Sequence, residues 1–147
     1  MVDPPNNGGF FFITLNKIEH IGIAVKDLGV ANTLYTKMLG VQPYKSEKVD
    51  SEGVTTSFFK VGDTKIELLE ATSAESPIAK FIEKRGEGIH HIAYEVDDIR
   101  TVMKRMKADG FKLLNEEPKK GADNKLVCFI HPKSAGGVLV ELVQEIR

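Results

Sequence analysis

The sequence predicts an α+β fold made of two tandem copies of one module. Residues 18–28 (IEHIGIAVKDL) match residues 89–99 (IHHIAYEVDDI), with isoleucine, histidine, valine and aspartate in the same columns. An amphipathic pattern of helical period follows each copy, and strand-like runs follow that pattern. The chain has 147 residues, about one domain's worth, so the two copies are expected to share one sheet and one core.

We therefore expect a single domain over residues 17–147. Its first module covers about 17–72, a linker helix 76–86, and its second module about 88–145. Residues 1–16 are expected to form a loose N-terminal tail, in which the short apolar run 10–15 is either a strand or a contact with a partner subunit.

Composition narrows the functional classes. The chain is 41% hydrophobic and 28% charged with a net charge of −1, which gives no electrostatic reason to bind nucleic acid or an anionic membrane. The apolar run 10–15 is too short to span a bilayer. Cys128 is the single cysteine, so no internal disulfide forms, and a cytoplasmic location is expected.

The first module begins with the strand-like HIGIAV and continues into a helix. Gly40 is expected to end this helix in a left-handed conformation, and strands follow at 54–61 and 65–69. The helix is expected to turn an apolar face to the sheet, formed by Ala31, Leu34, Tyr35 and Met38.

The linker and the second module follow the same logic. Ser76 caps the linker helix, Pro77 occupies its first turn, and Gly86 ends it, with Ile78, Phe81 and Ile82 facing inward. In the second module the helix is expected to bury Val102, Met103 and Met106 and to stop at Gly110, before strands at 125–130 and 138–143.

Four polar residues occupy matching places in apolar strands of the two copies. His20 aligns with His91, and Glu67 in IEL corresponds to Glu141 in VEL. Because strand side chains alternate between faces, adjacent His90 and His91 cannot point the same way. His90 shares its column with Glu19, a residue expected in water, so both are predicted to face outward and His91 inward. His90 is therefore expected to lie on the surface or behind a ligand, and not to be a ligand itself.

Two imidazoles and two carboxylates that face one interior predict a divalent metal site. Buried carboxylates need a compensating charge, and this nitrogen and oxygen set suits Co²⁺, Mn²⁺, Zn²⁺, Ni²⁺ or Fe²⁺. The alternative is that the histidines are hydrogen-bonded core residues and the glutamates pair with lysines such as Lys65 and Lys125. The symmetric placement of all four favours the metal.

These features resemble a known family. The segments HIGIAVKDL, VGDTKIELLE, SPIAKFIEKRGEGIHHIAYEVDDI, EEPKKGA and HPKSAGGVLVELVQ are similar to the methylmalonyl-CoA epimerase family of the vicinal oxygen chelate (glyoxalase/bleomycin resistance/dioxygenase) superfamily. The resemblance implies tandem βαβββ modules that form a cupped mixed sheet around one metal, in a homodimer. It implies the ligands His20, Glu67, His91 and Glu141, and an acyl-CoA substrate.

The implied activity is interconversion of (2R)- and (2S)-methylmalonyl-CoA by metal-assisted proton transfer at C2 through an enolate, which needs acid/base groups on both faces. Some family members carry a glutamate where this chain has Thr56, and threonine cannot be a base at neutral pH. We expect Glu67 and Glu141 to be the catalytic pair, with Glu52 an outside candidate.

Residues that meet the rest of the substrate are harder to assign. Basic and small residues around Gly121 and Gly136 are candidates for contacts with the CoA phosphates: Lys119, Lys120, Lys125, Lys133 and Ser134.

Two other functions remain open at this point. One is isomerisation of a hemithioacetal, as in glyoxalase I, which uses the same ligand set. The other is a metal-free small-molecule-binding resistance protein of the same fold, which would have no reason to keep four inward His and Glu residues.

Overall fold

A computed structural model of the protein describes residues 14–146. Residues 10–13 of the predicted apolar run 10–15, and most of the predicted tail, lie outside the described residues. Of the tail's last residues, Leu15 packs against the core of the second half, and the Asn16 N–H donates to the Glu95 carbonyl at 2.9 Å.

One mixed sheet carries the molecule, with strand order β2-β3-β4-β1-β5-β8-β7-β6. The strands are β1 (Lys17–Ala24), β2 (Lys45–Val49), β3 (Val54–Val61), β4 (Thr64–Ala71), β5 (Gly88–Glu95), β6 (Lys119–Lys120), β7 (Lys125–Ile130) and β8 (Val140–Glu145). The helices are α1 (Leu28–Leu39), α2 (Pro77–Arg85) and α3 (Ile99–Ala108).

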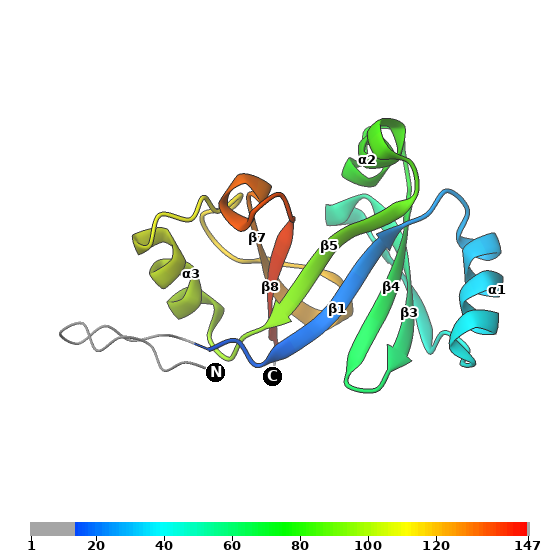
Figure 1. Ribbon diagram of the computed structural model, residues 1–147, viewed down its shortest axis with the longest axis horizontal. Coiled ribbons are helices and arrows are strands. Elements are labelled where there is room, and N and C mark those ends of the chain that lie inside the picture. The colour runs from blue at the N-terminus through cyan, green and yellow to red at the C-terminus, as the bar shows by residue number, and fades with distance from the viewer. Residues whose placement is uncertain (1–13, 147) are drawn as a thin grey trace.

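The two halves of the sheet repeat one another. β1 pairs in parallel with β4 and β5 in parallel with β8, while β1 and β5 join the halves as antiparallel neighbours. Read outward from that central pair, each half has the same strand order. In Figure 1 the sheet curls, with α1 at one end of the molecule and α3 at the other. The predicted cupped sheet of tandem βαβββ modules is confirmed.

The helices begin and end for local reasons. The carboxylates of Asp27 and Asp98 occupy the same column of the repeat and cap α1 and α3, accepting from Val30 N at 3.0 Å and Thr101 N at 3.2 Å. Gly40 ends α1 at φ 74°, as predicted. Helix α3 stops at Ala108, just before the predicted Gly110.

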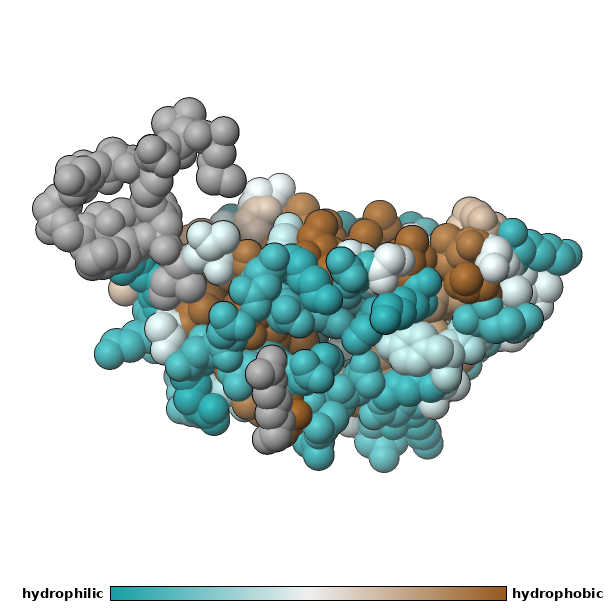
Figure 2. Space-filling view, turned by 90° about the horizontal axis from the view of Figure 1, so that it is seen from below, coloured by the Kyte–Doolittle hydropathy of each residue, from teal (hydrophilic) through white to brown (hydrophobic). Residues whose placement is uncertain are grey.

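The predicted apolar face of α1 was partly wrong. Leu34 and Met38 are 58% and 61% exposed, and only Leu28 and Ala31 of this helix are buried. The reason is position, because α1 lies at the end of the sheet and packs against β3 and β4 on one side only. Figure 2 shows apolar side chains along one margin of a face that is otherwise mostly hydrophilic.

Strand alternation sends the acidic pair away from the helices. Leu68 packs under α1 and Leu142 under α3, each as part of the core on that side of the sheet. The neighbouring residues Glu67 and Glu141 therefore project from the opposite face, which is the inside of the cup. The fold thus gives one interior that both halves line.

Helix α2 connects the halves and closes one end of the cup. Its cap is as predicted, since Ser76 Oγ accepts from Ile78 N at 3.2 Å, with Pro77 in the first turn and Gly86 after the end. Ile78 is buried, and Phe81 and Ile82 pack beside it.

Removal of this cap makes a first test of the fold. We expect Ser76→Ala to lower the free energy of unfolding by about 1 kcal/mol, because Ser76 is buried and the Ile78 N–H loses its acceptor. Urea denaturation measures this. Ser73→Ala, at an exposed side chain nearby, is the matched control, and equal stability of both variants would contradict the cap's role.

Candidate metal centre

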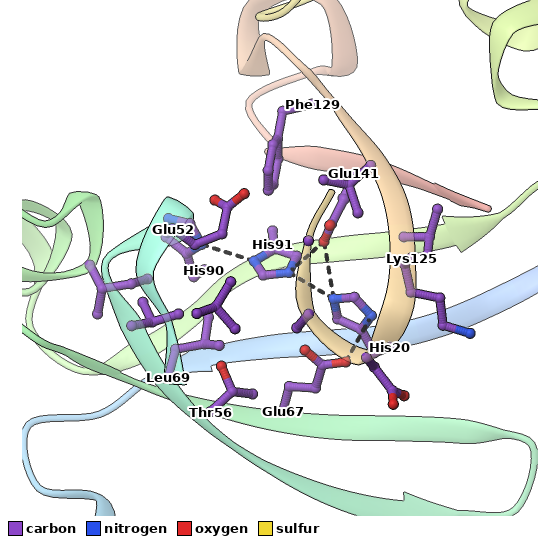
Figure 3. Close-up of a pocket in the computed structure, with 18 of the residues that line it drawn as sticks. His20, Glu52, Thr56, Glu67, Leu69, His90, His91, Lys125, Phe129 and Glu141 are labelled. Atoms are coloured by element: carbon purple, nitrogen blue, oxygen red, sulfur yellow. Dashed lines mark hydrogen bonds and ion pairs between the residues drawn. The ribbon is translucent and has the colours of Figure 1, made fainter. Parts of the chain in front are cut away.

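The four predicted ligands lie on the four central strands of the sheet. His20 is on β1, Glu67 on β4, His91 on β5 and Glu141 on β8, and each side chain lines one cavity of about 70 Å³ inside the cup (Figure 3). All four residues are only 5–6% exposed. The pseudo-symmetric pairs predicted from the repeat are therefore brought together in space.

Three of the four converge on one point. His20 Nε2 lies 2.9 Å from His91 Nε2, and Glu141 Oε1 lies 3.1 Å from the former and 3.0 Å from the latter. Glu141 Oε1 is buried, and no hydrogen bond to it is present among the described residues. Two imidazole nitrogens aimed at one carboxylate oxygen, away from water, are a donor set that a divalent cation satisfies.

Glu67 lies on the other side of the His20 ring. Its Oε2 is 3.1 Å from His20 Nδ1, whereas Glu141 faces Nε2. Two groups of metal-ligating type therefore occur in the described chain, namely His20, His91 and Glu141, and Glu19, His20 and Glu67, and His20 belongs to both. The residues fit a divalent ion. His20, His91 and Glu141 already lie together, and Glu67 lies on the opposite side of the His20 ring.

The prediction that Glu19 faces outward was wrong. Glu19 is 3% exposed, and its Oε1 lies 2.7 Å from His20 Nδ1 while its Oε2 lies 2.8 Å from Lys65 Nζ. The physical reason is a β-bulge in β1. Ile18 pairs with Tyr94 and His20 with Ala93, which leaves Glu19 as an extra residue, and a bulge breaks the alternation of side chains.

The outward prediction for His90 was wrong for the same reason. Gly22 pairs with His91 and Ile23 with Ile89, so His90 is the extra residue in β5. Its ring is half-buried, lines the cavity, and approaches His91 with the two Nδ1 atoms 2.9 Å apart.

Burial and neighbouring charges shift the pKa values of Glu67 and Glu141 in opposite directions and raise that of His20. Burial raises the pKa of Glu67 to about 7, and the charges of Glu141 and Glu19 add to that rise. Burial alone would raise the pKa of Glu141, but His20 holds it well below its usual range. Burial alone would lower the pKa of His20, but Glu67 and Glu141 raise it well above its usual value.

These shifts predict how the stability of the metal-free chain changes with pH. Glu67 and His20 have folded-state pKa values above their unfolded ones. The stability that they contribute to the metal-free fold is therefore present at low pH and is lost as the pH rises through their folded-state pKa values. Burial lowers the pKa of His90 to about 4, which acts in the opposite direction, but only below about pH 6.5. We therefore expect the free energy of unfolding to fall between pH 6.5 and 8.5.

Urea denaturation after chelator treatment, at several pH values in that window, measures this fall. Added Co²⁺ is expected to stabilise the fold more at pH 8.5 than at pH 6.5, because ligand protons compete with the metal. A metal-free stability that rises across the window would contradict the charge states assigned to His20 and Glu67.

The predicted substrate residues do not form one cluster. Lys125 is buried and lines the cavity, and Lys119 and Lys120 are exposed on the edge strand β6. Lys133 and Ser134 belong to a separate short 3-10 turn at Pro132–Ala135, where Ser134 Oγ accepts from Lys112 N at 2.9 Å. The first group thus lies near the cavity and the second lies elsewhere on the surface of its half.

Thr56 and Glu52, the two other positions considered for the second base, also line the cavity. Thr56 is buried, and its Oγ1 has no hydrogen-bond partner among the described residues. Glu52 lines the cavity too, with its Oε1 3.6 Å from Lys119 Nζ (Figure 3). Phe129 lies against the His91 ring, with the ring centroids 5.7 Å apart.

The sequence reasoning missed Glu19 and the ion pairs behind it. Lys65 contacts Asp123 Oδ2 at 3.1 Å as well as Glu19, so it links β1 to the turn at Ala122–Asn124 that lines the cavity. The alignment of Glu19 with His90, each directly before a candidate ligand, was a signal that could have singled out both.

Comparison with known proteins agrees with the geometry. The family model of the glyoxalase/bleomycin resistance protein/dioxygenase superfamily matches residues 19–129. The mitochondrial methylmalonyl-CoA epimerase of Homo sapiens is 43% identical over 88% of this chain and 74% of its own. An ethylmalonyl-CoA/methylmalonyl-CoA epimerase of Cereibacter sphaeroides is 44% identical over 88% of this chain and 98% of its own.

A solved structure extends the match to three dimensions. It is a methylmalonyl-CoA epimerase in complex with methylmalonyl-CoA and NH₄⁺, superposes with a TM-score of 0.87 at 33% identity, and covers 90% of this chain and 96% of its own. The family model spans the strands that carry His20, Glu67 and His91, and the relatives and the solved structure cover 88–90% of the chain. The chain belongs to the methylmalonyl-CoA epimerase family of the glyoxalase/bleomycin resistance protein/dioxygenase superfamily.

Proposed function

We propose that this protein is a metal-dependent epimerase that interconverts (2R)- and (2S)-methylmalonyl-CoA. The observation that carries the proposal is the buried meeting of His20, His91 and Glu141 within about 3 Å of one another, with Glu67 against the same imidazole. Relatives that bear this activity in their names share more than 40% identity with nearly the whole chain. The ligand set alone would also suit glyoxalase I chemistry, so family membership decides between them.

The reaction requires removal and return of one proton. C2 of the substrate lies between a thioester and a carboxylate, and loss of its proton leaves charge on their oxygens. His20, His91, Glu141 and Glu67 are the residues that would hold a divalent ion, which supplies Lewis-acid stabilisation of that charge.

Inversion at C2 needs one proton-transferring group on each face of the planar intermediate. We propose that Glu67 and Glu141 perform this, one accepting the C2 proton while the other delivers a proton from the opposite side. Their placement against the two different nitrogens of His20 supports that division. Leu69, Val127 and Phe129 line the same cavity and limit access of water to the transferred proton.

The size of the cavity sets how the substrate enters. About 70 Å³ accommodates a few water-sized groups, so the malonyl end enters and the remainder of CoA lies outside. We propose that Lys119, Lys120 and Lys125 near the cavity meet phosphate or carboxylate oxygens. Lys133 and Ser134 remain candidates for contacts farther along the CoA chain.

Deuterium exchange at C2 tests the proposed function. The full chain is freed of metal with a chelator, and one portion is reloaded with Co²⁺. Both are then incubated with (2S)-methylmalonyl-CoA in D₂O, and deuterium and the (2R) form are measured by mass spectrometry and chiral assay. We expect exchange and inversion with Co²⁺ and a fall of at least about 100-fold without it.

The rival functions are outcomes of the same experiment. Methylglyoxal with glutathione is assayed in parallel, and turnover there without exchange on the CoA ester would favour a glyoxalase I activity. Absence of metal binding together with absence of both activities would favour a metal-free binding protein. A Glu67→Gln variant with normal metal content and full exchange would remove Glu67 from the catalytic pair.

Two broader expectations remain proposals. None of the described helices is long and apolar enough to span a membrane. We propose a cytoplasmic homodimer that uses Co²⁺, Mn²⁺, Zn²⁺, Ni²⁺ or Fe²⁺. Light scattering of the purified protein and elemental analysis of its metal content test the oligomeric state and the ion.

A further inference from the structure

The two β-bulges at the centre of the sheet occupy equivalent places in the two modules. Glu19 is the extra residue in β1 and His90 the extra residue in β5 of the same antiparallel pair. Each directly precedes a candidate ligand, and those ligands, His20 and His91, are separated by 71 residues, as are Glu19 and His90. The bulge is therefore part of the repeated module and not a local irregularity.

Each bulge residue contacts the same atom of the ligand that follows it. Glu19 Oε1 lies 2.7 Å from His20 Nδ1, and His90 Nδ1 lies 2.9 Å from His91 Nδ1. In both cases the other ring nitrogen, Nε2, is the one aimed at Glu141, at 3.1 and 3.0 Å. An acceptor at Nδ1 holds the proton there and leaves the Nε2 lone pair free, which is how groups behind metal-binding histidines commonly orient them.

Glu19 is held in place from its other oxygen. Its Oε2 lies 2.8 Å from Lys65 Nζ, so the carboxylate accepts from two donors, an imidazole N–H and an ammonium. Lys65 is held in turn by Asp123, whose other carboxylate oxygen contacts Lys45. A carboxylate can accept from both donors at once, whereas an amide has only one acceptor atom.

His90 is held in place by packing. Its ring lies edge-on to Phe81 of α2, with the centroids 5.0 Å apart, and perpendicular to His91. The linker helix therefore fixes His90, as the ion pairs fix Glu19. The two bulge residues are thus held by different neighbours, but each contacts Nδ1 of the histidine that follows it.

We propose that Glu19 and His90 are a matched pair of positioning residues that fix the Nδ1–H form and the orientation of His20 and His91, and so present both Nε2 atoms to the metal. This rests on the proposed metal centre. Glu67 also approaches His20 Nδ1, but at 3.1 Å against 2.7 Å for Glu19, so Glu19 is the nearer acceptor and leaves Glu67 available for ligand or proton-transfer chemistry.

Metal affinity is the first test. The full chain and its Glu19→Gln variant are titrated with Co²⁺, followed by visible absorption and by competition with a chelator of known affinity. We expect Co²⁺ binding to weaken by about 10-fold or more, because the amide cannot accept from both His20 and Lys65. Glu117→Gln is the matched control, since Glu117 is also paired with a basic side chain, at 3.9 Å from Arg100, but contacts neither a candidate ligand nor the ion pairs that hold Glu19.

The second test separates positioning from a purely structural role. Spectra of ¹⁵N-histidine-labelled protein loaded with Zn²⁺, which is diamagnetic, report which ring nitrogen of His20 carries the proton. In the parent chain we expect a protected, downfield Nδ1–H signal, which should shift or vanish in Glu19→Gln and persist in Glu117→Gln. Circular dichroism confirms that each variant is folded.

His90 has its own pair of variants. His90→Leu removes the contact with His91 Nδ1, whereas His90→Asn places an amide oxygen near the position of the lost Nδ1. We expect Co²⁺ binding to weaken by about 10-fold in the leucine variant and to recover most of that loss in the asparagine variant.

The outcomes distinguish this inference from the proposed function. Glu19→Gln and His90→Leu that bind Co²⁺ within about 2-fold of the parent, with unchanged ring-proton signals, would overturn the positioning roles and leave the metal centre standing. A parent chain that binds no Co²⁺ would overturn the metal centre and this inference with it. Equal weakening in His90→Leu and His90→Asn would overturn the contact at Nδ1 as the cause.

Discussion

Replacing Glu141 by glutamine is expected to lower the rate of C2 exchange by at least about 10³-fold, equivalent to about 4 kcal/mol of transition-state stabilisation. Glu141 Oε1 is the atom on which both histidine Nε2 atoms converge, and it is buried in the cavity. Glutamine keeps the size of the side chain but removes the charge that offsets the ion and the basicity that proton transfer requires.

The assay must separate loss of metal from loss of chemistry. Exchange is therefore measured at saturating Co²⁺, with bound metal determined in the same sample. Glu145→Gln, an exposed position on the same strand β8, is the control and is expected to keep parent activity. A Glu141→Gln variant that retains bound Co²⁺ and more than about a tenth of parent exchange would exclude Glu141 as an essential base.

Gly22→Ala is expected to have the largest effect of any substitution outside the ligands. Gly22 lies opposite His91 across the β1–β5 pair, and a Cβ built there would lie 2.2 Å from His91 Cε1, 2.6 Å from Nδ1 and 2.7 Å from Nε2. The whole imidazole occupies that space, so the ring must move. We expect a loss of about 1–3 kcal/mol in the free energy of unfolding and at least about 100-fold weaker Co²⁺ binding.

The same substitution elsewhere on the chain provides the control. Gly29 lies in the first turn of α1, where a Cβ would meet only Asp27 Oδ1 at 3.4 Å. Gly29→Ala is therefore expected to be neutral or slightly stabilising, because alanine favours a helix over glycine. Urea denaturation and Co²⁺ titration of both variants decide the matter, and a Gly22→Ala variant with parent metal affinity would show that the His91 ring tolerates displacement.

The repeat in the sequence was sufficient to predict the paired modules and the four ligand candidates. His20 and His91 could be recognised because their columns agree, and Glu67 and Glu141 because each lies among aliphatic residues of a closing strand. These are local properties, since side-chain alternation and apolar patterning are set by neighbours along the chain. The linker helix with its Ser76 cap and Gly86 end is local in the same sense.

The errors have a tertiary origin. Alternation predicted outward side chains for Glu19 and His90, but a bulge depends on how β1 and β5 pair, and the partner strand lies about 70 residues away along the chain. The apolar stripe of α1 predicted burial of Leu34 and Met38. In the fold, however, α1 lies at the end of the sheet, and none of the described residues covers these two side chains. Neither fact is encoded in a short window of sequence.

The sequence by itself thus determined the modules, the helix ends and the identity of the four candidate ligands. Only the tertiary structure decided that three of these ligands meet at one point while Glu67 lies across the His20 ring, and that Glu19 and His90 stand directly behind the histidines. The physical reason is that ligand geometry depends on the register and bulges of strands from both halves of the chain, and these are fixed only when the two modules pair.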